Sequence, residues 1–262
     1  MILVDCHNLV YRVAYTHHGL SHNGVSTGAI FGFLKQVLGL MEKYPTGYSG
    51  EICFCWDSPR SLRKEFHPEY KGNRNKDDPP PEVADARGQI DLLRNDILPR
   101  IGFPNQIFQG GYEADDLIGA LARSPGRHII ISSDHDLYQL LGPSTAMHRP
   151  GKSDLYTHRD FMVEFGIAPS LWTEAKALAG DPGDNIVGLK GVGIRTAIKL
   201  LLGNGSDKLV QRVRNNMDII NRNRRLVTLP WEGCDPGDVR GSKLDRDELY
   251  DVCREYGIRV LS

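Results

Sequence analysis

The stretch RHIIISSD, residues 127–134, passes through three consecutive isoleucines and ends on an aspartate. Short β-branched runs of this kind, closed by polar residues, are typical of buried strands. Similar runs recur in the first part of the chain: MILVD at 1–5, EICFCWD at 51–57 and NQIFQG at 105–110. Helical patterns lie between them, at residues 29–44 and 88–102. The alternation predicts an α/β fold over roughly residues 1–150, with a mainly parallel twisted sheet flanked by helices.

Aspartates follow three of these runs. Asp5, Asp57 and Asp134 each stand at the carboxyl end of a predicted strand. In an open parallel sheet the carboxyl ends of the strands meet at one edge, where active sites lie. We therefore expect these three side chains to be neighbours.

The stretch GGYEADDLIGALA, residues 110–122, crowds further acids at the start of a predicted helix. For Asp115 and Asp116 alone, a favourable interaction with the helix dipole, about 0.3–1 kcal/mol each, would be a sufficient explanation. The wider set is harder to explain in this way, because carboxylates that converge on one crevice repel one another unless cations neutralise them. The acids at strand ends or turns are Asp5, Asp57, Glu113, Asp115, Asp116, Asp134, Asp136, Asp181 and Asp184.

Oxygen ligands without a His/Cys cluster favour Mg²⁺ or Mn²⁺ over zinc. Two such ions, about 3.5–4 Å apart, would suit in-line displacement at a phosphoryl group. The five cysteines are odd in number and form no CxxC pair, so neither a disulfide framework nor a zinc site is expected. No signal peptide or membrane span is evident, so we expect a cytoplasmic protein, and nothing specifically signals oligomerisation, so we expect a monomer.

The net charge of −1 hides two basic segments. Residues 59–76 carry six Lys/Arg against two Asp/Glu, and residues 187–225 carry nine against two. Basic patches on an acidic body suggest a polyanionic partner such as nucleic acid, although solvated basic faces are common. In the first segment Lys71 and Arg74 would share a face if the piece is helical and could reach one phosphate, and Tyr70 could stack on a base.

The second basic segment contains a glycine-rich turn. Gly188, Gly191 and Gly193 precede a predicted helix at 194–202, a geometry that exposes backbone N–H groups to phosphate. No base-reading side chain is obvious there. Binding through this turn would be independent of sequence and sensitive to salt.

Six motifs in order make the chain similar to the 5′ nucleases: flap endonucleases, phage 5′-3′ exonucleases and the N-terminal nuclease domain of bacterial DNA polymerase I. They are ILVDCHNLVYR, CFCWDS, LRKEFHPEYKGNR, YEADDLIGALA, IISSDHDLYQLL and ALAGDPGDNIVGLKGVGIRTAIKLL. The resemblance implies a PIN-like nuclease core, a helical arch over the active site and a helix-three-turn-helix module that binds duplex DNA. It divides the chain into a core at 1–160 with the arch at 58–85, a helical module at 161–230 with its helix-three-turn-helix at 181–203, and a segment at 231–262 that packs on the core.

The resemblance also implies roles for individual residues. Asp5, Asp57, Glu113, Asp115 and Asp116 look like ligands of a first metal ion, and Asp134, Asp136, Asp181 and Asp184 like those of a second. Lys71 and Arg74 look like arch residues that contact the scissile phosphate. The turn from Gly188 to Gly193 looks like the element whose carbonyls hold K⁺ beside a DNA phosphate. The DNA-binding residues expected in all are Arg12, Tyr70, Gly188, Lys190, Gly191, Gly193, Arg195 and Thr196.

The expected function is divalent-metal-dependent 5′-3′ exonuclease and flap endonuclease activity on DNA, in primer or flap removal or DNA degradation, with RNA–DNA hybrids as possible substrates. Three alternatives stay open at this point. A PIN-type ribonuclease would share the acids but normally lacks the arch and the glycine-rich module. A haloacid-dehalogenase-like phosphatase needs a second aspartate where His7 stands. A non-catalytic DNA-binding protein would have no need of nine placed acids.

Overall fold

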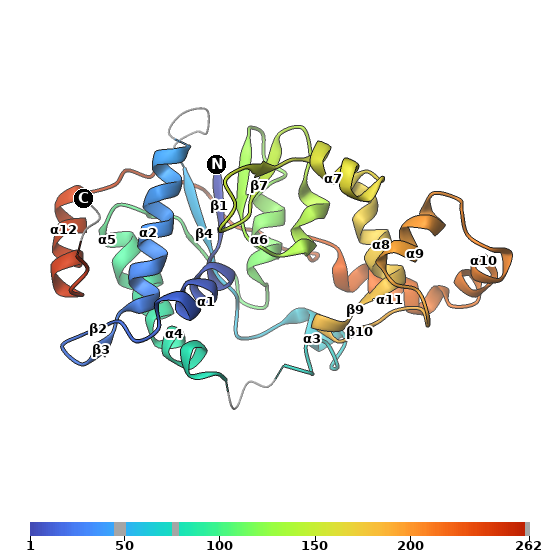
Figure 1. Ribbon diagram of the computed structural model, residues 1–262, viewed down its shortest axis with the longest axis horizontal. Helices are drawn as coiled ribbons and strands as arrows, with labels where there is room; N and C mark the ends of the chain where they lie inside the picture. Colours follow the sequence, from blue (N-terminus) through green and yellow to red (C-terminus); the bar gives the residue numbers. More distant parts are fainter. Residues whose placement is uncertain (45–50, 75–78, 260–262) are drawn as a thin grey trace.

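A six-stranded sheet forms the centre of the computed structural model, which describes residues 1–44, 51–74 and 79–259 (Figure 1). The strand order is β5-β4-β1-β6-β7-β8. All neighbouring strands are parallel except β8, which runs antiparallel to β7. The expected mainly parallel sheet is confirmed. Its strands are β1 (Ile2–Asp5), β4 (Ile52–Cys55), β5 (Gln106–Ile107), β6 (His128–Ile131), β7 (Thr145–His148) and β8 (Leu155–Tyr156).

The three central strands are buried along their whole length, which explains their continuous apolar sequences. Ile2 lies opposite Ile52 on one side and Ile129 on the other, so the strands end nearly in register. Asp5 is the last residue of β1, whereas Asp57 and Asp134 follow β4 and β6 by a few residues. The predicted meeting of these chain segments at one sheet edge is therefore present.

Alternate strand residues enter two apolar cores. Val4 and Phe54 belong to one core, with α1 (Cys6–His17), α2 (Gly28–Lys43) and α4 (Pro81–Leu92). Leu3 and Ile130 belong to the other, with α6 (Ala114–Leu121) and α8 (Trp172–Ala179). The second core continues into α9 (Ile194–Leu201) and α11 (Met217–Val227) through Ala197 and Ile220. The helical module is thus packed on the sheet by a continuous apolar cluster.

The helices expected at 29–44 and 194–202 are α2 and α9. The one expected at 88–102 is broken: α4 is followed by a π-helical turn at Leu93–Ile97 and by α5 (Leu98–Arg100). The sequence reading missed β7, β8 and the hairpin of β2 (Ser21–His22) and β3 (Val25–Ser26). The remaining elements are η2 (His135–Leu140), α7 (His158–Phe165), η3 (Pro169–Leu171), β9 (Gly180–Asp181), η4 (Pro182–Asp184), β10 (Ile186–Val187), α10 (Asp207–Arg214) and α12 (Arg246–Glu255).

The segment expected as a helical arch, 58–85, contains the five-residue α3 (Leu62–Phe66) and the start of α4. Residues 67–74 form turns, and Lys71 has a left-handed backbone with φ of 53°. Residues 75–78 of the expected arch lie outside the described residues. The helical face that Lys71 and Arg74 were expected to share is therefore not formed.

The segment after residue 231 contacts the sheet side of the molecule. Asn105 donates its side-chain amide to Ile52 and Arg240 carbonyls, at 3.1 and 2.7 Å. In α12, Leu249 and Val252 join the core of α1 and α2. The described residues 231–259 thus pack on the core; 260–262 of the expected segment lie outside the description. Across residues 1–44, 51–74 and 79–259, no helix has the length and apolarity needed to cross a membrane.

Candidate metal centre and nucleic-acid interface

Asp5 is held at the edge of the sheet by hydrogen bonds from α1 and from the residue that follows β6. It caps α1, accepting a hydrogen bond from the Asn8 amide at 3.2 Å, and accepts another from the Ser132 hydroxyl at 2.8 Å. Only 5% of Asp5 is exposed. Asp57 accepts from the Ala114 amide at the start of α6, at 2.8 Å, which brings the β4 end and α6 together.

The start of α6 contributes three acids. Glu113 caps the helix, and its side chain and that of Asp116 bind each other's backbone N–H groups reciprocally. This capping box explains why Glu113 and Asp116 stand three residues apart. Asp115 stands between them in sequence. The charges of Asp134 and Asp5 raise its pKa, which places Asp115 near the acids at the sheet edge.

Burial and neighbouring charges raise the pKa of Asp5 and of Asp115. Burial, then the charge of Asp57, raises the pKa of Asp5 to about 7. Burial, then the charge of Asp134, raises the pKa of Asp115 well above its usual range. Buried like charges favour protonation unless a cation is present, so this edge of the sheet is a place where a divalent ion would be stabilised.

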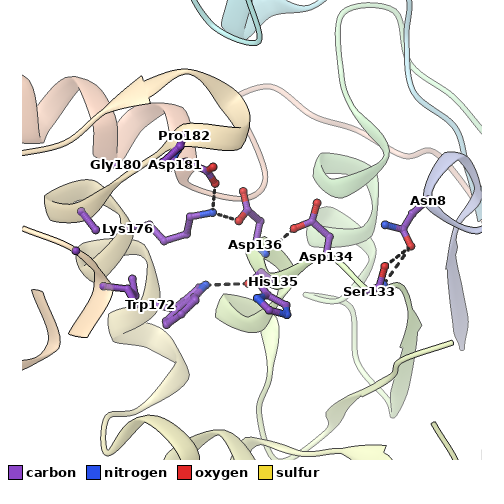
Figure 2. A pocket seen from close by; sticks show the side chains of 13 residues that line it. Asn8, Ser133, Asp134, His135, Asp136, Trp172, Lys176, Gly180, Asp181 and Pro182 are labelled. Atoms are coloured by element: carbon purple, nitrogen blue, oxygen red, sulfur yellow. Dashed lines mark hydrogen bonds and ion pairs between the residues drawn. The ribbon is translucent and has the colours of Figure 1, made fainter. Parts of the chain in front are cut away.

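A second group of acids surrounds a lysine in an open pocket of about 700 Å³ (Figure 2). Lys176, in α8, donates to both Asp136 and Asp181, and only 7% of it is exposed. Burial raises the pKa of Asp136 to about 6, although Lys176 opposes the shift. For Asp181 burial also opposes ionisation, but the Lys176 charge and backbone hydrogen bonds lower its pKa overall. Asp134 lines the same pocket.

The expected arch cations lie against the acids. Lys71 Nζ is 2.7 Å from Glu113 Oε2 and 3.9 Å from Asp184 Oδ2. Arg74 Nη2 is 2.6 Å from Asp184 Oδ1. Lys71 and Arg74 therefore both contact Asp184, and they do so from turns and not from a shared helical face.

Tyr70 does not have the surface position that base stacking requires. It is 3% exposed, and its hydroxyl donates to Glu113 at 2.9 Å and Asp184 at 3.0 Å. The ring packs in an apolar cluster with Tyr112, Ile186 and Trp231. The expectation that Tyr70 contacts DNA bases is therefore corrected: it anchors the turn that carries Lys71.

Asp116 is also corrected. Its side chain is fully buried, and both carboxylate oxygens accept from Arg63, at 2.6 and 2.7 Å. It also accepts from the Trp231 amide at 2.7 Å. A carboxylate already engaged in this way lacks a free lone pair directed at the crevice, so we remove Asp116 from the candidate metal ligands.

The expected DNA-binding residues fall on two surfaces. Arg12 is exposed on α1, beside Gly151. Lys190 and Arg195 are exposed around the turn before α9, while Thr196 is partly buried in its first turn. A Cβ on Gly188 would lie 2.1 Å from the Ala179 carbonyl oxygen, so this position requires glycine. Gly191 has a φ of +75°, and Gly193 caps α9.

Sequence reasoning missed several residues that organise the site. They are Lys176, Arg63, Ser132, Asn8 and His7, whose Nδ1 accepts from the Asp57 amide at 3.1 Å. The signal available for Lys176 is a lysine between two alanines in α8, five residues before Asp181. Arg63 offers none, because its neighbour Lys64 is equally basic and exposed.

The donor set fits hard cations, because it consists of carboxylate oxygens. In the described part of the chain, no group of three or more His, Cys, Asp or Glu is arranged to hold one ion directly. Mg²⁺ commonly keeps several waters and uses one or two carboxylates, so this arrangement suits an ion bound partly through water.

Comparison with known protein families shows to which of them this chain belongs. Residues 1–166 match the family described as 5′-3′ exonuclease, N-terminal resolvase-like domain. The chain belongs to this 5′-3′ exonuclease family. It is 33% identical over 223 residues to the thermostable DNA polymerase I of Thermus thermophilus, covering 83% of the chain and 25% of that protein. It is 29% identical over 289 residues to the DNA polymerase I of Mycobacterium tuberculosis, covering 100% of the chain and 31% of that protein.

This chain therefore spans about a quarter to a third of the length of these two DNA polymerases. Solved structures agree on the fold of the family. The phage T5 5′-exonuclease with bound zinc ions has a TM-score of 0.71 at 22% identity, over 88% of this chain and 89% of that one. Human GEN1 in complex with Holliday junction DNA has a TM-score of 0.59 at 14% identity, over 98% of this chain and 67% of that one.

Proposed function

We propose that the protein hydrolyses DNA phosphodiesters at or near 5′ ends, as a divalent-metal-dependent 5′-3′ exonuclease and flap endonuclease. The observation that carries the proposal is the gathering of Asp5, Asp115 and Asp134 from β1, α6 and the segment after β6, with Lys71 beside Glu113 at the start of α6. Membership of the 5′-3′ exonuclease family supports it. A role in primer or flap removal or DNA degradation, and action on RNA–DNA hybrids, belong to the same proposal.

Two divalent ions, Mg²⁺ or Mn²⁺, are proposed at these acids. Asp5, Asp57, Glu113 and Asp115 would hold the first, and Asp134, Asp136, Asp181 and Asp184 the second, in part through water. The raised pKa values of Asp5 and Asp136 support an ion at each group, because a cation would restore both carboxylates to the ionised form. Bound divalent ions supply activation of water and stabilisation of charge on the phosphoryl oxygens.

The basic side chains would act on the substrate phosphate. Lys71 and Arg74 enter the acidic crevice from the same segment, and both contact Asp184. In a DNA complex we propose that a phosphate replaces these carboxylate contacts, so that the two cations orient it. Lys71 would contribute a point charge and Arg74 a planar pair of donors.

Duplex DNA is proposed to bind across the turn of Gly188 to Gly193, with Arg12, Lys190, Arg195 and Thr196 at its surface. The close packing at Gly188 supports backbone contact with phosphate, as does the start of α9, to which no side chain of the described residues supplies a cap. K⁺ is proposed at the carbonyls of this turn. One of them, that of Lys190, accepts from Arg212 at 2.6 Å, so a bound ion would use the others or displace that contact.

The test uses labelled 5′-flap DNA, blunt duplex DNA and RNA, each incubated with the protein in Mg²⁺ or in EDTA, and the products are sized. Short 5′ products from flap or duplex DNA in Mg²⁺ alone are expected. Cleavage of RNA without cleavage of DNA would favour a PIN-type ribonuclease, and binding without cleavage a DNA-binding protein.

A further inference from the structure

The buried ion pair of Arg63 and Asp116 joins three parts of the molecule. Arg63 belongs to α3, at the base of the expected arch, and is 3% exposed. Asp116 belongs to the first turn of α6, whose neighbouring acids are proposed metal ligands. The guanidinium makes two parallel contacts with the carboxylate, at 2.6 and 2.7 Å, a geometry that fixes orientation as well as distance.

The same pair also holds the end of the helical module. Arg63 donates through Nε to the Leu226 carbonyl at 2.8 Å and through Nη2 to the Thr228 carbonyl at 3.2 Å. Asp116 accepts from the Trp231 amide at 2.7 Å. The last turn of α11 and the loop after it are therefore bound to the two charged groups from both sides.

A second layer of contacts covers this pair from the outside. Phe66 of α3 meets Trp231 at a centroid distance of 5.6 Å, and the Arg225 guanidinium of α11 lies 4.4 Å from the Phe66 ring. The arch base therefore cannot move away from α11 without breaking both layers.

The arch segment contacts the start of α6 at two points. At one, Arg63 holds Asp116; at the other, Lys71 and Tyr70 hold Glu113. Glu113 and Asp116 are themselves linked, because the Glu113 amide donates to Asp116 Oδ2 at 3.1 Å. A shift of Arg63 would thus move the proposed ligand Glu113 through one intervening hydrogen bond.

We infer that Arg63 and Asp116 form one positioning unit, which sets Glu113 and Lys71 against each other and couples the DNA-binding module to the metal centre. The inference rests on the proposed nuclease function and deepens it. It makes Asp116 a residue that acts through its neighbours, in contrast to Asp115, which is a proposed ligand. Both members of the pair are buried, so they would act through their neighbours.

The experiment uses three variants of the full chain: Arg63→Gln, Asp116→Asn and the double variant that combines them. Each is compared with Asp115→Asn, which removes a proposed metal ligand. Single-turnover rates on 5′-flap DNA are measured against Mg²⁺ concentration, together with DNA affinity in Ca²⁺. Hydrogen exchange at the Glu113 and Trp231 amides is followed in EDTA. The control is Arg254→Gln with Asp251→Asn, an exposed pair on α12 with a 3.0 Å contact.

We expect Arg63→Gln and Asp116→Asn each to slow the single-turnover rate by at least about tenfold, with DNA affinity changed by less than about threefold. The Mg²⁺ concentration that gives half the maximal rate should rise less in these variants than in Asp115→Asn. The double variant should be no slower than the slower single variant, because the pair acts as a unit. Both amides should exchange faster in Asp116→Asn, and the α12 control should match the wild type.

The inference is overturned if Asp116→Asn raises half-saturating Mg²⁺ as much as Asp115→Asn does, since Asp116 would then be a ligand. The inference is also overturned if the double variant slows the single-turnover rate by the product of the two single effects. If Arg63→Gln does not fold, Arg63→Lys keeps the charge but loses the paired contact; an unchanged rate in that variant would count against the inference. A wild type that cuts nothing in Mg²⁺ refutes the proposed nuclease, whereas the amide exchange still tests the pair.

Discussion

Replacing Asp5 by asparagine should stabilise the metal-free protein while abolishing Mg²⁺-dependent cleavage. The pKa of Asp5 is raised from 3.8 to about 7, first by burial and then by the charge of Asp57. Its folded pKa therefore exceeds its unfolded pKa, and the folded state binds the proton more tightly. Below about pH 4 the carboxyl does not lower the free energy of unfolding. Its destabilising effect grows as pH rises towards 7 and is fully present above that.

The magnitude follows from the size of the shift. A rise of the Asp5 pKa from 3.8 to about 7 corresponds to about 4 kcal/mol at pH 8, and because Asp5 titrates jointly with its neighbours we expect roughly half of that. Asparagine can keep both contacts of Asp5, accepting from the Asn8 amide and donating to the Ser132 hydroxyl, so little packing is lost. A gain of about 2 kcal/mol would raise the melting temperature by roughly 4–8 °C.

The assay is thermal unfolding of Asp5→Asn and wild type in EDTA from pH 4 to pH 8. The variant's advantage should be near zero at pH 4 and largest at pH 8, and added Mg²⁺ should reduce it by stabilising the wild type. Asp91→Asn, at an exposed position on α4, is the matched control and should show no pH-dependent advantage. An Asp5→Asn protein that is less stable than wild type at pH 8, or an advantage that does not grow with pH, would refute the reasoning.

Three further outcomes are expected. Lys71→Ala should lower the single-turnover rate by about 10²-fold, with DNA affinity in Ca²⁺ nearly unchanged, because its ammonium would act at the reacting phosphate; a pure binding defect in stopped-flow experiments would contradict that position. Lys176→Met removes a cation that competes for two carboxylates, so calorimetric titration should show Mg²⁺ or Mn²⁺ binding about tenfold tighter, and weaker binding would show that the lysine supports the site. Gly188→Ala would bring a methyl group to 2.1 Å from the Ala179 carbonyl oxygen, so the turn must shift; fluorescence anisotropy should show weaker duplex binding, with cleavage of short single strands less affected.

The three central strands of the sheet, and the edge at which their carboxyl ends meet, could be predicted from the sequence because they depend on local patterns. Three apolar runs ending near Asp5, Asp57 and Asp134 predicted parallel strands and a common edge, and the register confirms that arrangement. The short strands β7 and β8 were not predicted, because they lack a long apolar run. Their conformation depends on pairing with β6 and with each other.

Contacts between residues far apart in the sequence could not be predicted from local patterns. Tyr70 reads as a surface aromatic, yet it is buried because Ile186 and Trp231, more than a hundred residues away in sequence, cover it. Asp116 reads as a third acid in a crowded turn, and only the fold brings Arg63 to it across the arch segment. Residue type and spacing describe what a side chain can do, whereas its partners depend on tertiary packing.

The pairing of charges indicates where ions would be needed. Glu113, Asp136, Asp181 and Asp184 each have a lysine or arginine partner, and Asp116 has Arg63. Within the described residues, no such ion pair involves Asp5, Asp115 or Asp134. Within the described residues, the protein's own cations thus form ion pairs with Glu113, Asp136, Asp181 and Asp184 and leave the other three acids to be balanced from outside. A divalent ion at Asp5 and Asp115 would offset both burial and the charges of neighbouring acids, and it would not compete with a lysine ion pair as an ion beside Lys176 would. We therefore expect that group to bind its ion more tightly than the group around Lys176.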